Sequence, residues 1–377
     1  MADNNENKVL NVPHLRFPEF SGEWKKHSLG EIGETIIGLT YKPSDVVDNN
    51  GIIVFRSSNI KNGMIDYSDL VRVNKHIKDK IITKENDILV CARNGSQRLI
   101  GKNAIIKQED ANNTFGAFMM VYRANDNPFI LPLLSTKKYF SQVGENLGAR
   151  INQITTSDFN GFEFYFPENH AERTKIAELF RLLDERIATQ NKIIYKLKSL
   201  IRGIAQNMVH RGKPNVRLSD CMICNSSTLQ ESEVLESGTY PVYGANGIVG
   251  YLDCYATLNE AIYIIKDGSG VGTVFYVAGK CSAAGTLNTL QAKEGYSLQY
   301  LYYLLTVFNF EPYKTGMAIP HIYFKDYGKA KVFCPSHSEQ FKYTKLLSTI
   351  DSKLLAEQNA LVNYNLQKQY LLRQMFI

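Results

Sequence analysis

The stretch from Arg173 to Val209 contains no proline, and its apolar residues recur at alternating spacings of four and three. This spacing places them along one side of a helix, as in the seam of a coiled coil. A seam of this kind requires a second helix to cover it. The seam positions of this first run include Ile176, Phe180, Leu183, Ile187, Gln190, Ile194 and Leu197.

The end of the chain supplies a matching helix. Between about Gln340 and Phe376 the same spacings recur, and the seam positions lie 167 residues after those of the first run. The two runs are therefore predicted to be the two helices of one coiled coil. The second set of seam positions includes Leu347, Ile350, Leu354, Glu357 and Leu361.

The regions before the two helices also resemble each other, which indicates a duplication of a whole domain. Residues 148–167, GARINQITTSDFNGFEFYFP, align without gaps on 316–335, GMAIPHIYFKDYGKAKVFCP. Further upstream, DILVCARNGS at 87–96 lies over EAIYIIKDGS at 260–269. This second alignment places Arg93 opposite Lys266 and predicts that the two residues are equivalent.

Each repeat contains short strand-like runs separated by turn residues, together with one apolar helical segment. We therefore predict an α+β fold with two similar domains, and an N-terminal segment from 9 to 24 that packs on the domain after it. The predicted divisions are 1–167, a helix in 168–212, 213–334 and a helix in 335–377. Strands are expected at 52–55, 87–90, 104–106, 118–122, 162–166, 240–243, 248–251, 260–265 and 274–277, and helices at 129–140 and 298–308.

Composition limits the functional classes only weakly. The 377 residues carry a formal net charge of +6, which is compatible with a polyanionic partner but does not establish one. The first dozen residues do not read as a secretory signal, and the most apolar run, Tyr300 to Phe310, is far shorter than the roughly 20 residues that span a bilayer. We therefore expect a soluble, cytoplasmic protein.

The motifs that usually signal catalysis are incomplete or missing. The glycines of 268–272 lack the Lys-Ser or Lys-Thr pair of a phosphate loop, and 127–129, NPF, is only part of a methyltransferase signature and is predicted to begin a helix. The seven His and six Cys show no metal-type pairing, and the Cys are expected to be reduced. These absences favour a binding protein over an enzyme.

Polar and basic loops remain as candidate binding residues. Arg, Asn and Gln are the side chains that read base edges, whereas Lys and Ser commonly contact phosphates. A loop is also polar because water surrounds it, and for any one of these residues that explanation stays open. The candidates are Arg56, Ser58, Asn59, Arg93, Asn94, Ser96, Gln97, Arg98, Lys102, Arg150, Asn152 and Gln153 in the first repeat, and Tyr243, Asn246, Lys266, Ser269 and His321 in the second.

The succession of domain, long helix, domain and long helix resembles the specificity subunit of type I restriction-modification enzymes. The segments VPHLRFPEFSGEW, DILVCARNGS, GARINQI and LDERIATQNKIIYKLKSLIRGIAQNMV carry this resemblance, which covers nearly the whole chain. It implies that two target-recognition domains each read one half of a bipartite DNA sequence. It also implies that the helices form an antiparallel coiled coil that separates the domains and binds methyltransferase subunits.

The resemblance further implies a non-catalytic chain that binds double-stranded DNA, two methyltransferase subunits and restriction subunits with a motor activity. It implies no cofactor on this chain, with S-adenosylmethionine, ATP and Mg²⁺ on the partners, and no metal or membrane. The polar pair Gln190 and Glu357 is interpreted as fixing the register of the helices, at some cost in stability. The alternative is a two-domain coiled-coil scaffold without a DNA role.

Overall fold

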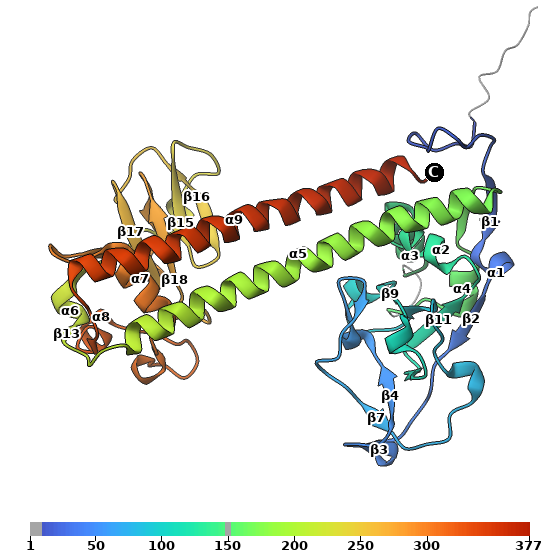
Figure 1. Ribbon diagram of the computed structural model, residues 1–377, viewed down its shortest axis with the longest axis horizontal. Coiled ribbons are helices and arrows are strands. Elements are labelled where there is room, and N and C mark those ends of the chain that lie inside the picture. Colours follow the sequence, from blue (N-terminus) through green and yellow to red (C-terminus); the bar gives the residue numbers. More distant parts are fainter. Residues whose placement is uncertain (1–9, 148–151) are drawn as a thin grey trace, which may run out of the picture. The chain divides into compact units, whose positions relative to one another are not determined.

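The computed structural model describes residues 10–147 and 152–377 of the chain. It divides into two compact units, one of residues 1–189 with 361–377 and the other of residues 190–360. Two long helices, α5 (His170–His210) and α9 (His337–Gln374), contribute to both units. Each unit adds its own strands and short helices, so the expected α+β class with two domains is confirmed (Figure 1).

In the first unit, the sheet nearest the core has four antiparallel strands in the order β2-β11-β8-β9. All four residues of β8 are buried, because the sheet is covered on both faces. A second sheet has the order β10-β4-β7-β3, and β1 pairs with β12. The strands are β1 Lys25–Ser28, β2 Glu34–Ile37, β3 Val46–Val47, β4 Ile52–Phe55, β5 Ile60–Lys61, β6 Met64–Ile65, β7 Arg72–Val73, β8 Ile88–Cys91, β9 Asn103–Ile105, β10 Thr114–Phe115, β11 Met119–Arg123 and β12 Glu163–Phe166.

The second unit repeats this plan with a four-stranded sheet, β14-β20-β17-β18, and a three-stranded sheet, β16-β15-β19. The helix α7 (Leu298–Val307) packs against the larger sheet and buries most of its apolar residues. The strands are β13 Val216–Arg217, β14 Met222–Ser226, β15 Tyr240–Gly244, β16 Gly247–Leu252, β17 Glu260–Ile265, β18 Val274–Ala278, β19 Ser282–Ala283, β20 Leu287–Ala292 and β21 Lys331–Val332. Short helices in the two units are α1 Leu29–Ile32, α4 Thr156–Asn160, α6 Leu218–Cys221 and α8 Phe324–Tyr327.

The predicted helix at 129–140 is wrong in one respect, because the structure contains two helices there. The first, α2, spans Asn127–Leu133, and the second, α3, spans Lys137–Leu147. The hydroxyl of Thr136 accepts a hydrogen bond from the Tyr139 backbone N–H at 3.3 Å, which is the contact of an N-cap residue. The predicted strands 52–55 and 260–265 match β4 and β17, and the remaining predicted strands differ from the observed ones by about one residue at an end.

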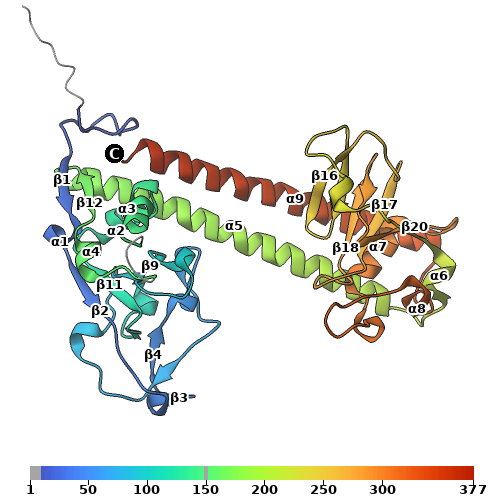
Figure 2. The same cartoon turned by 180° about the vertical axis from the view of Figure 1, so that it is seen from behind.

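The helices α5 and α9 pair in opposite directions within each unit (Figures 1 and 2). In the first unit Asp184 forms an ion pair with Lys368, and Arg186 donates to the Tyr364 hydroxyl. In the second unit Arg211 donates to the Tyr343 hydroxyl at 2.6 Å. The seam residues are buried or half-buried, as the heptad pattern predicts. They are Ile176, Phe180, Leu183, Ile187, Gln190, Ile194, Leu197, Leu347, Ile350, Leu354, Glu357 and Leu361.

The N-terminal segment packs on both helices of the first unit, as expected from its aromatic content. Trp24 is 2% exposed and lies edge-on to Phe376, with ring centroids 6.3 Å apart. Arg16 makes a two-pronged ion pair with Glu172 of α5, at 2.7 and 2.8 Å. The carboxylate of Glu172 is fully buried and also accepts from the Trp24 indole N–H at 3.3 Å.

Candidate nucleic-acid interface

Three loops of the first unit that are distant in sequence meet at the end of β8. The side-chain amide of Asn94 donates to the Ser57 hydroxyl at 2.9 Å, and Asn152 donates to the Gly95 carbonyl at 2.9 Å. A backbone bridge also joins Arg93 to Gln153. The loops 56–59, 93–98 and 152–153 therefore form one surface, which we call the first loop cluster. Arg150 lies outside the described residues.

Arg93 is an exposed cation of this cluster, and it lies over an aromatic ring. Its guanidinium carbon is 5.2 Å from the ring centroid of Phe118, which is itself 59% exposed. The Phe118 carbonyl accepts hydrogen bonds from both the Ala92 and Arg93 backbone N–H groups, each at 3.0 Å. Among the described residues, no carboxylate pairs with the Arg93 guanidinium, so its donors remain available to a ligand.

Phe118 did not emerge from the sequence as a candidate, because the run 118–122 was predicted to be entirely strand. In the structure β11 begins one residue later, at Met119, and Phe118 belongs to the preceding turn. The available signal was the run of apolar residues FMMVY, which is too uniform for a strand with one exposed face. An aromatic side chain exposed beside a guanidinium is a common feature of surfaces that bind nucleic-acid bases.

The prediction that Asn59 contacts a ligand is wrong, because its side chain is fully buried. Its amide donates to the backbone carbonyls of Asp66 and Asp69, at 3.0 and 2.8 Å, and its oxygen accepts from the Arg56 N–H at 2.9 Å. Asn59 thus fixes the loop rather than reading a base. The Arg56 guanidinium is held by an ion pair to Asp69 at 2.8 Å, which reduces its availability.

The other candidates of the first unit differ in exposure. Ser58, Ser96, Gln97 and Arg98 are exposed, and Gln97 and Arg98 lie on a short 3-10 turn. The Ser96 N–H donates to the Asn94 side-chain oxygen at 3.0 Å, which closes the turn that presents them. Lys102 is half-buried where the chain returns into the sheet. Beneath it, burial raises the pKa of the Cys91 thiol to about 11, so this sulfur is not a thiolate at neutral pH.

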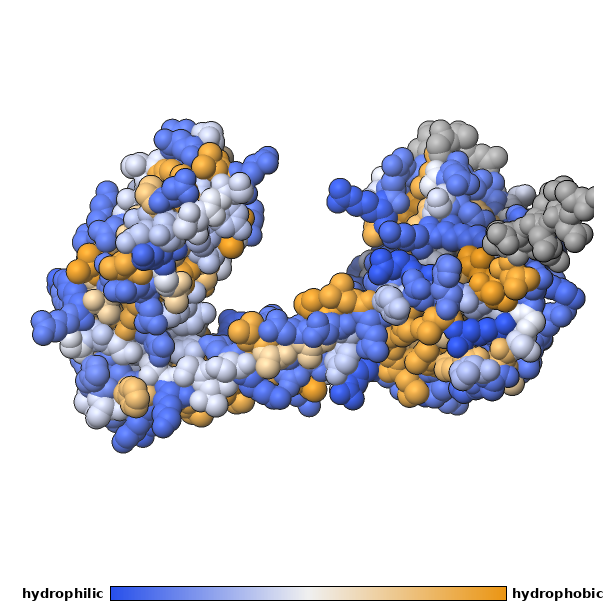
Figure 3. Space-filling view, turned by 90° about the horizontal axis from the view of Figure 1, so that it is seen from above, coloured by the Kyte–Doolittle hydropathy of each residue, from blue (hydrophilic) through white to orange (hydrophobic). Residues whose placement is uncertain are grey.

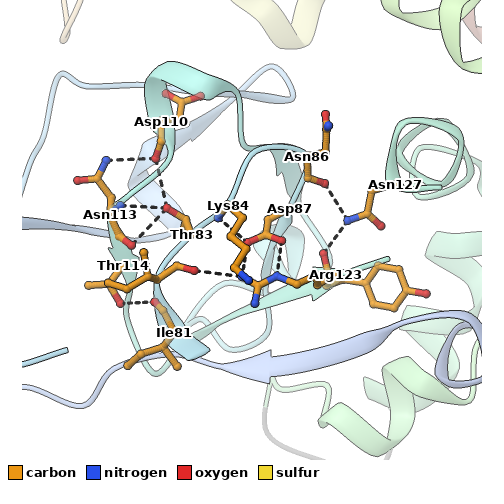
Figure 4. A network of polar contacts seen from close by, with 12 residues as sticks. Ile81, Thr83, Lys84, Asn86, Asp87, Asp110, Asn113, Thr114, Arg123 and Asn127 are labelled. Atoms are coloured by element: carbon orange, nitrogen blue, oxygen red, sulfur yellow. Dashed lines mark hydrogen bonds and ion pairs between the residues drawn. The ribbon is translucent and has the colours of Figure 1, made fainter. Parts of the chain in front are cut away.

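A buried polar network ties β8 to β11 at the end of β8 opposite to the loop cluster (Figure 4). Arg123 of β11 donates to both carboxylate oxygens of Asp87, at 2.8 and 2.7 Å, and to the Ile82 carbonyl at 3.0 Å. Hydrogen bonding to Asp87 raises the pKa of the Arg123 guanidinium. Asn127 donates to the carbonyls of Asn86 and Tyr122 at 2.8 and 2.9 Å, so the NPF segment has the structural role that its helical position predicts.

In the second unit, the corresponding surface lies at the end of β17. It contains Asp267, Ser269 and His321, and we call it the second loop cluster. The His321 Nδ1 lies 2.6 Å from a carboxylate oxygen of Asp267, and a backbone bridge joins the same two residues. Ser269 is exposed in the turn that connects β17 to β18. That turn contains Gly268 and Gly272, both with positive φ, and this glycine-rich stretch closes the hairpin of β17 and β18.

Tyr243 and Asn246 lie on and beyond β15. Tyr243 is half-buried against Tyr263, with ring centroids 5.9 Å apart, and burial raises the pKa of its hydroxyl. Its carbonyl accepts from the Ala284 N–H at 2.8 Å. Asn246 is exposed in the turn between β15 and β16. Tyr243 is therefore partly structural, whereas the side chain of Asn246 is accessible to a ligand.

The backbone hydrogen bonds correct the predicted equivalence of Arg93 and Lys266. In the first unit Ile154 N–H donates to the Ala92 carbonyl at 2.9 Å, and in the second Ile322 N–H donates to the Lys266 carbonyl at 2.9 Å. Lys266 is thus the equivalent of Ala92. The bridge from Arg93 to Gln153 is matched by the bridge from Asp267 to His321. The residue in the position of Arg93 is therefore Asp267, a carboxylate that the sequence comparison missed by one residue.

The strand registers give the same answer independently. Cys91 is opposite Met119 in the first unit, and Ile265 is opposite Leu287 in the second. Since side chains alternate between the faces of a strand, a displacement of one residue moves a side chain to the opposite face. Lys266 is therefore a candidate DNA-contacting residue only because it is next to Asp267.

Other kinds of site find little support in the described ranges 10–147 and 152–377. No group of three or more His, Cys, Asp or Glu residues there is placed to hold a metal ion, and no helix there is long and apolar enough to cross a membrane. The six cysteines are free, and four of them are buried. The CxxC pair, Cys221 and Cys224, has no partner pair at metal-binding spacing.

Comparison with known families identifies the class of protein. The model of the type I restriction modification DNA specificity domain matches twice, over residues 21–199 and 214–364. These two matches cover most of the chain and coincide with the two repeats. The chain therefore belongs to the family of type I restriction-modification DNA specificity proteins.

Curated relatives support this membership at low identity. The specificity subunit of the type I restriction enzyme EcoKI from Escherichia coli K12 is 25% identical over 205 residues, covering 52% of this chain and 44% of the relative. The StySPI specificity subunit from Salmonella potsdam is 25% identical over 191 residues, covering 48% of this chain and 41% of the relative. The matches thus span less than half the length of these relatives.

Solved structures share the fold over nearly the whole chain. A type I restriction-modification S subunit from M. genitalium superposes with a TM-score of 0.65 at 19% identity, covering 97% of this chain and 99% of the other. A chain from a study of complex assembly and conformational transition in a type I restriction-modification system gives a TM-score of 0.51 at 15% identity, covering 96% and 98%. At such identities the likeness establishes the fold alone.

Proposed function

We propose that this chain is the DNA sequence-specificity subunit of a type I restriction-modification complex, in which each α+β domain reads one half of a bipartite target. The proposal rests on the duplication of the domain. Each region that matches the DNA specificity domain contains a loop cluster held by equivalent backbone hydrogen bonds. Two such clusters on one chain suit a target with two separate halves.

The side chains of the clusters suit the major groove of DNA. An Arg donates to two acceptors of guanine, and Asn or Gln pairs with adenine, so Arg93, Asn152 and Gln153 are suitable base-reading residues. Ser and Lys side chains contact phosphates and fix the orientation of the protein on the duplex. The exposed Ser58, Ser96 and Ser269 are suited to that second role.

In this proposal, the paired helices set the separation of the half-sites and bind the methyltransferase subunits. A helix of 41 residues such as α5 is about 60 Å long, the length of roughly 18 base pairs. Apolar side chains remain exposed on the helices, and orange patches on this part of the surface are visible in Figure 3. Such side chains suit a protein partner. They include Leu182, Leu200, Leu355, Val362 and Leu366.

The chain is proposed to be non-catalytic and to act in the cytoplasm, where chromosomal DNA is accessible. Methyl transfer, translocation and cleavage are assigned to the methyltransferase and restriction subunits, which would bind S-adenosylmethionine, ATP and Mg²⁺. This chain would contribute recognition, so its substitutions should change which sequence is modified. They should not change the chemistry of modification.

Co-expression with a candidate methyltransferase, followed by sequencing of the methylated DNA, tests the proposal. We expect the two proteins to co-purify and to methylate a split sequence. Exchanging residues 25–165 for those of a relative should change one half of this sequence and leave the other half intact. A continuous motif, or a change in both halves, would contradict the assignment of one domain to each half-site.

The role of the helices is tested separately. Inserting one heptad into α5 and α9 together adds about 10 Å to each helix, because a residue rises about 1.5 Å. The unread spacer of the methylated motif should lengthen by about three base pairs, with both halves unchanged. An unaltered spacer in a folded, active complex would exclude the helices as the element that sets the spacing.

A salt titration separates DNA recognition from a scaffold without a DNA role. A protein that neutralises several phosphates loses affinity steeply as salt rises, because binding releases counterions. We expect the complex to bind its methylated motif with such a dependence. If the complex fails to bind duplex DNA at every salt concentration tested, the scaffold without a DNA role is favoured.

A further inference from the structure

The two loop clusters differ in charge at one position, Arg93 in the first unit and Asp267 in the second, which the backbone hydrogen bonds show to be equivalent. Arg93 and Asp267 each follow the last residues of a buried strand and each bridge to a residue of the returning loop, Gln153 and His321 respectively. The frame around this position is the same, because the Ala92 N–H donates to the Phe118 carbonyl at 3.0 Å and the Lys266 N–H donates to the Thr286 carbonyl at 3.0 Å. One position thus carries opposite charges in the two units.

We infer that this position determines whether one base of each half-site must offer hydrogen-bond acceptors or a donor. Arg93 selects guanine, and Asp267 selects a base with an exocyclic amino group. The inference rests on the proposed function and adds to it the kind of base that each unit reads. Guanine presents two acceptors, O6 and N7, in the major groove, whereas cytosine and adenine present an amino group.

The surroundings of Arg93 prepare it to donate to a ligand. A guanidinium has only donors, and stacking on an aromatic ring restricts its movement without using them. Phe118 supplies the ring, and its own exposed fraction of 59% leaves an apolar edge beside the guanidinium. The methyl group of a thymine next to the guanine would suit this edge, since apolar side chains contact that methyl in the major groove.

Asp267 is prepared to accept in the same position. Its side chain is 34% exposed, and one of its oxygens lies 2.6 Å from Nδ1 of His321, which is 35% exposed. Bonding to His321 leaves the carboxylate with a further oxygen that can accept from an amino group. The second unit also lacks the aromatic ring, because Thr286 occupies the place of Phe118. An Arg in this position would therefore lack the ring that Phe118 provides in the first unit.

A partly exposed carboxylate near DNA also discriminates by repulsion. The phosphates repel Asp267, and bases that present only acceptors in the major groove offer no donor to its second oxygen. Only an amino group compensates for these costs. This makes Asp267 selective even though it adds no general affinity, whereas Arg93 adds both affinity and selectivity.

The test compares the methylated motif of the complex with that of complexes carrying single substitutions. Arg93→Gln should reduce the preference for guanine at one position of the first half-site by about tenfold or more, and leave the second half-site unchanged. Asp267→Ala removes the acceptor and should reduce a preference for cytosine or adenine at one position of the second half-site, and the base that is lost identifies which amino group is read. Lys107→Ala and Glu294→Gln alter exposed charges away from the clusters and serve as matched controls.

Arg93→Lys separates reading from folding. It keeps the positive charge but loses the two-pronged donor geometry, so the complex should remain assembled and bind DNA while its preference for guanine falls. A motif that Arg93→Gln and Asp267→Ala leave unaltered overturns the inference, as does a first half-site without guanine. A wild-type complex that shows no sequence preference instead contradicts the proposed function itself.

Discussion

The side-chain amide of Gln190 donates a hydrogen bond to the backbone carbonyl of Glu357, 3.0 Å away, and these residues occupy matching seam positions of the two repeats. In an antiparallel helix pair, a residue meets its own equivalent only at the centre of the pairing. Gln190 is 5% exposed, and its amide also contacts the Glu357 carboxylate, which pairs with Lys353. A polar contact at this point suits the role of fixing the register.

Replacing Gln190 alone should destabilise the protein, because Leu at this position leaves the half-buried polar groups of Glu357 with fewer partners. We expect Gln190→Leu to lower the free energy of unfolding by about 1–3 kcal/mol. The double substitution Gln190→Leu with Glu357→Leu should be neutral or stabilising, since a continuous apolar seam replaces both polar groups. Urea unfolding of both variants, with the exposed Gln206→Leu as control, measures this. Equal losses in the single and double variants would show that the polar groups of Gln190 and Glu357 do not compensate each other.

A buried carboxylate in the first unit provides a second test. Glu172 is fully buried, and Glu172→Ala would leave Arg16, whose side chain is 15% exposed, without its anionic partner. The expected loss is about 3–5 kcal/mol in the free energy of unfolding. Trp24, the only tryptophan, is 2% exposed and contacts Glu172, so its fluorescence reports the transition.

The control for this substitution is Glu178→Ala on the same helix. Glu178 forms an ion pair with Arg181, but both side chains are about half exposed, at 51% and 52%. Exposed pairs contribute at most about 1 kcal/mol, so this variant should unfold almost as the parent does. Comparable losses in the two variants would show that Glu172 has no special structural role.

The sequence predicted the helices and the duplication well, because both depend on patterns that persist over many residues. The heptad spacing from Ile176 to Leu197 can be recognised even where single residues depart from it. The same holds for the gapless match that ends at Pro167 and Pro335. The pairing of Arg93 with Lys266 failed because strand register depends on hydrogen bonds that leave no mark in a short match. Phe118 and the capping role of Thr136 were missed for a related reason, since one residue at a strand or helix end decides each of them.

Asp351 predicts how the stability of the second unit depends on pH. Burial raises the pKa of its carboxyl, and a hydrogen bond from the Tyr303 hydroxyl offsets this in part. A raised pKa in the folded state means that folding favours the protonated acid, so this residue's contribution to stability is lost as pH rises through the folded-state pKa. Asp351→Asn removes the titration. Its free energy of unfolding relative to the parent should therefore increase from pH 4 to pH 7, measured by urea unfolding, and a constant difference would contradict this.

The six cysteines should differ in their reactivity with a thiol reagent. Cys254 is exposed, Cys224 is half-buried, and Cys91, Cys221, Cys281 and Cys334 are buried. Burial also raises the pKa of Cys224 to about 11, so at pH 8 few of its thiols are in the reactive thiolate form. We expect one thiol of the folded protein to react rapidly with a disulfide reagent and all six to react in denaturant. Cys254→Ser should abolish the rapid phase, and its persistence in that variant would show that another thiol is accessible.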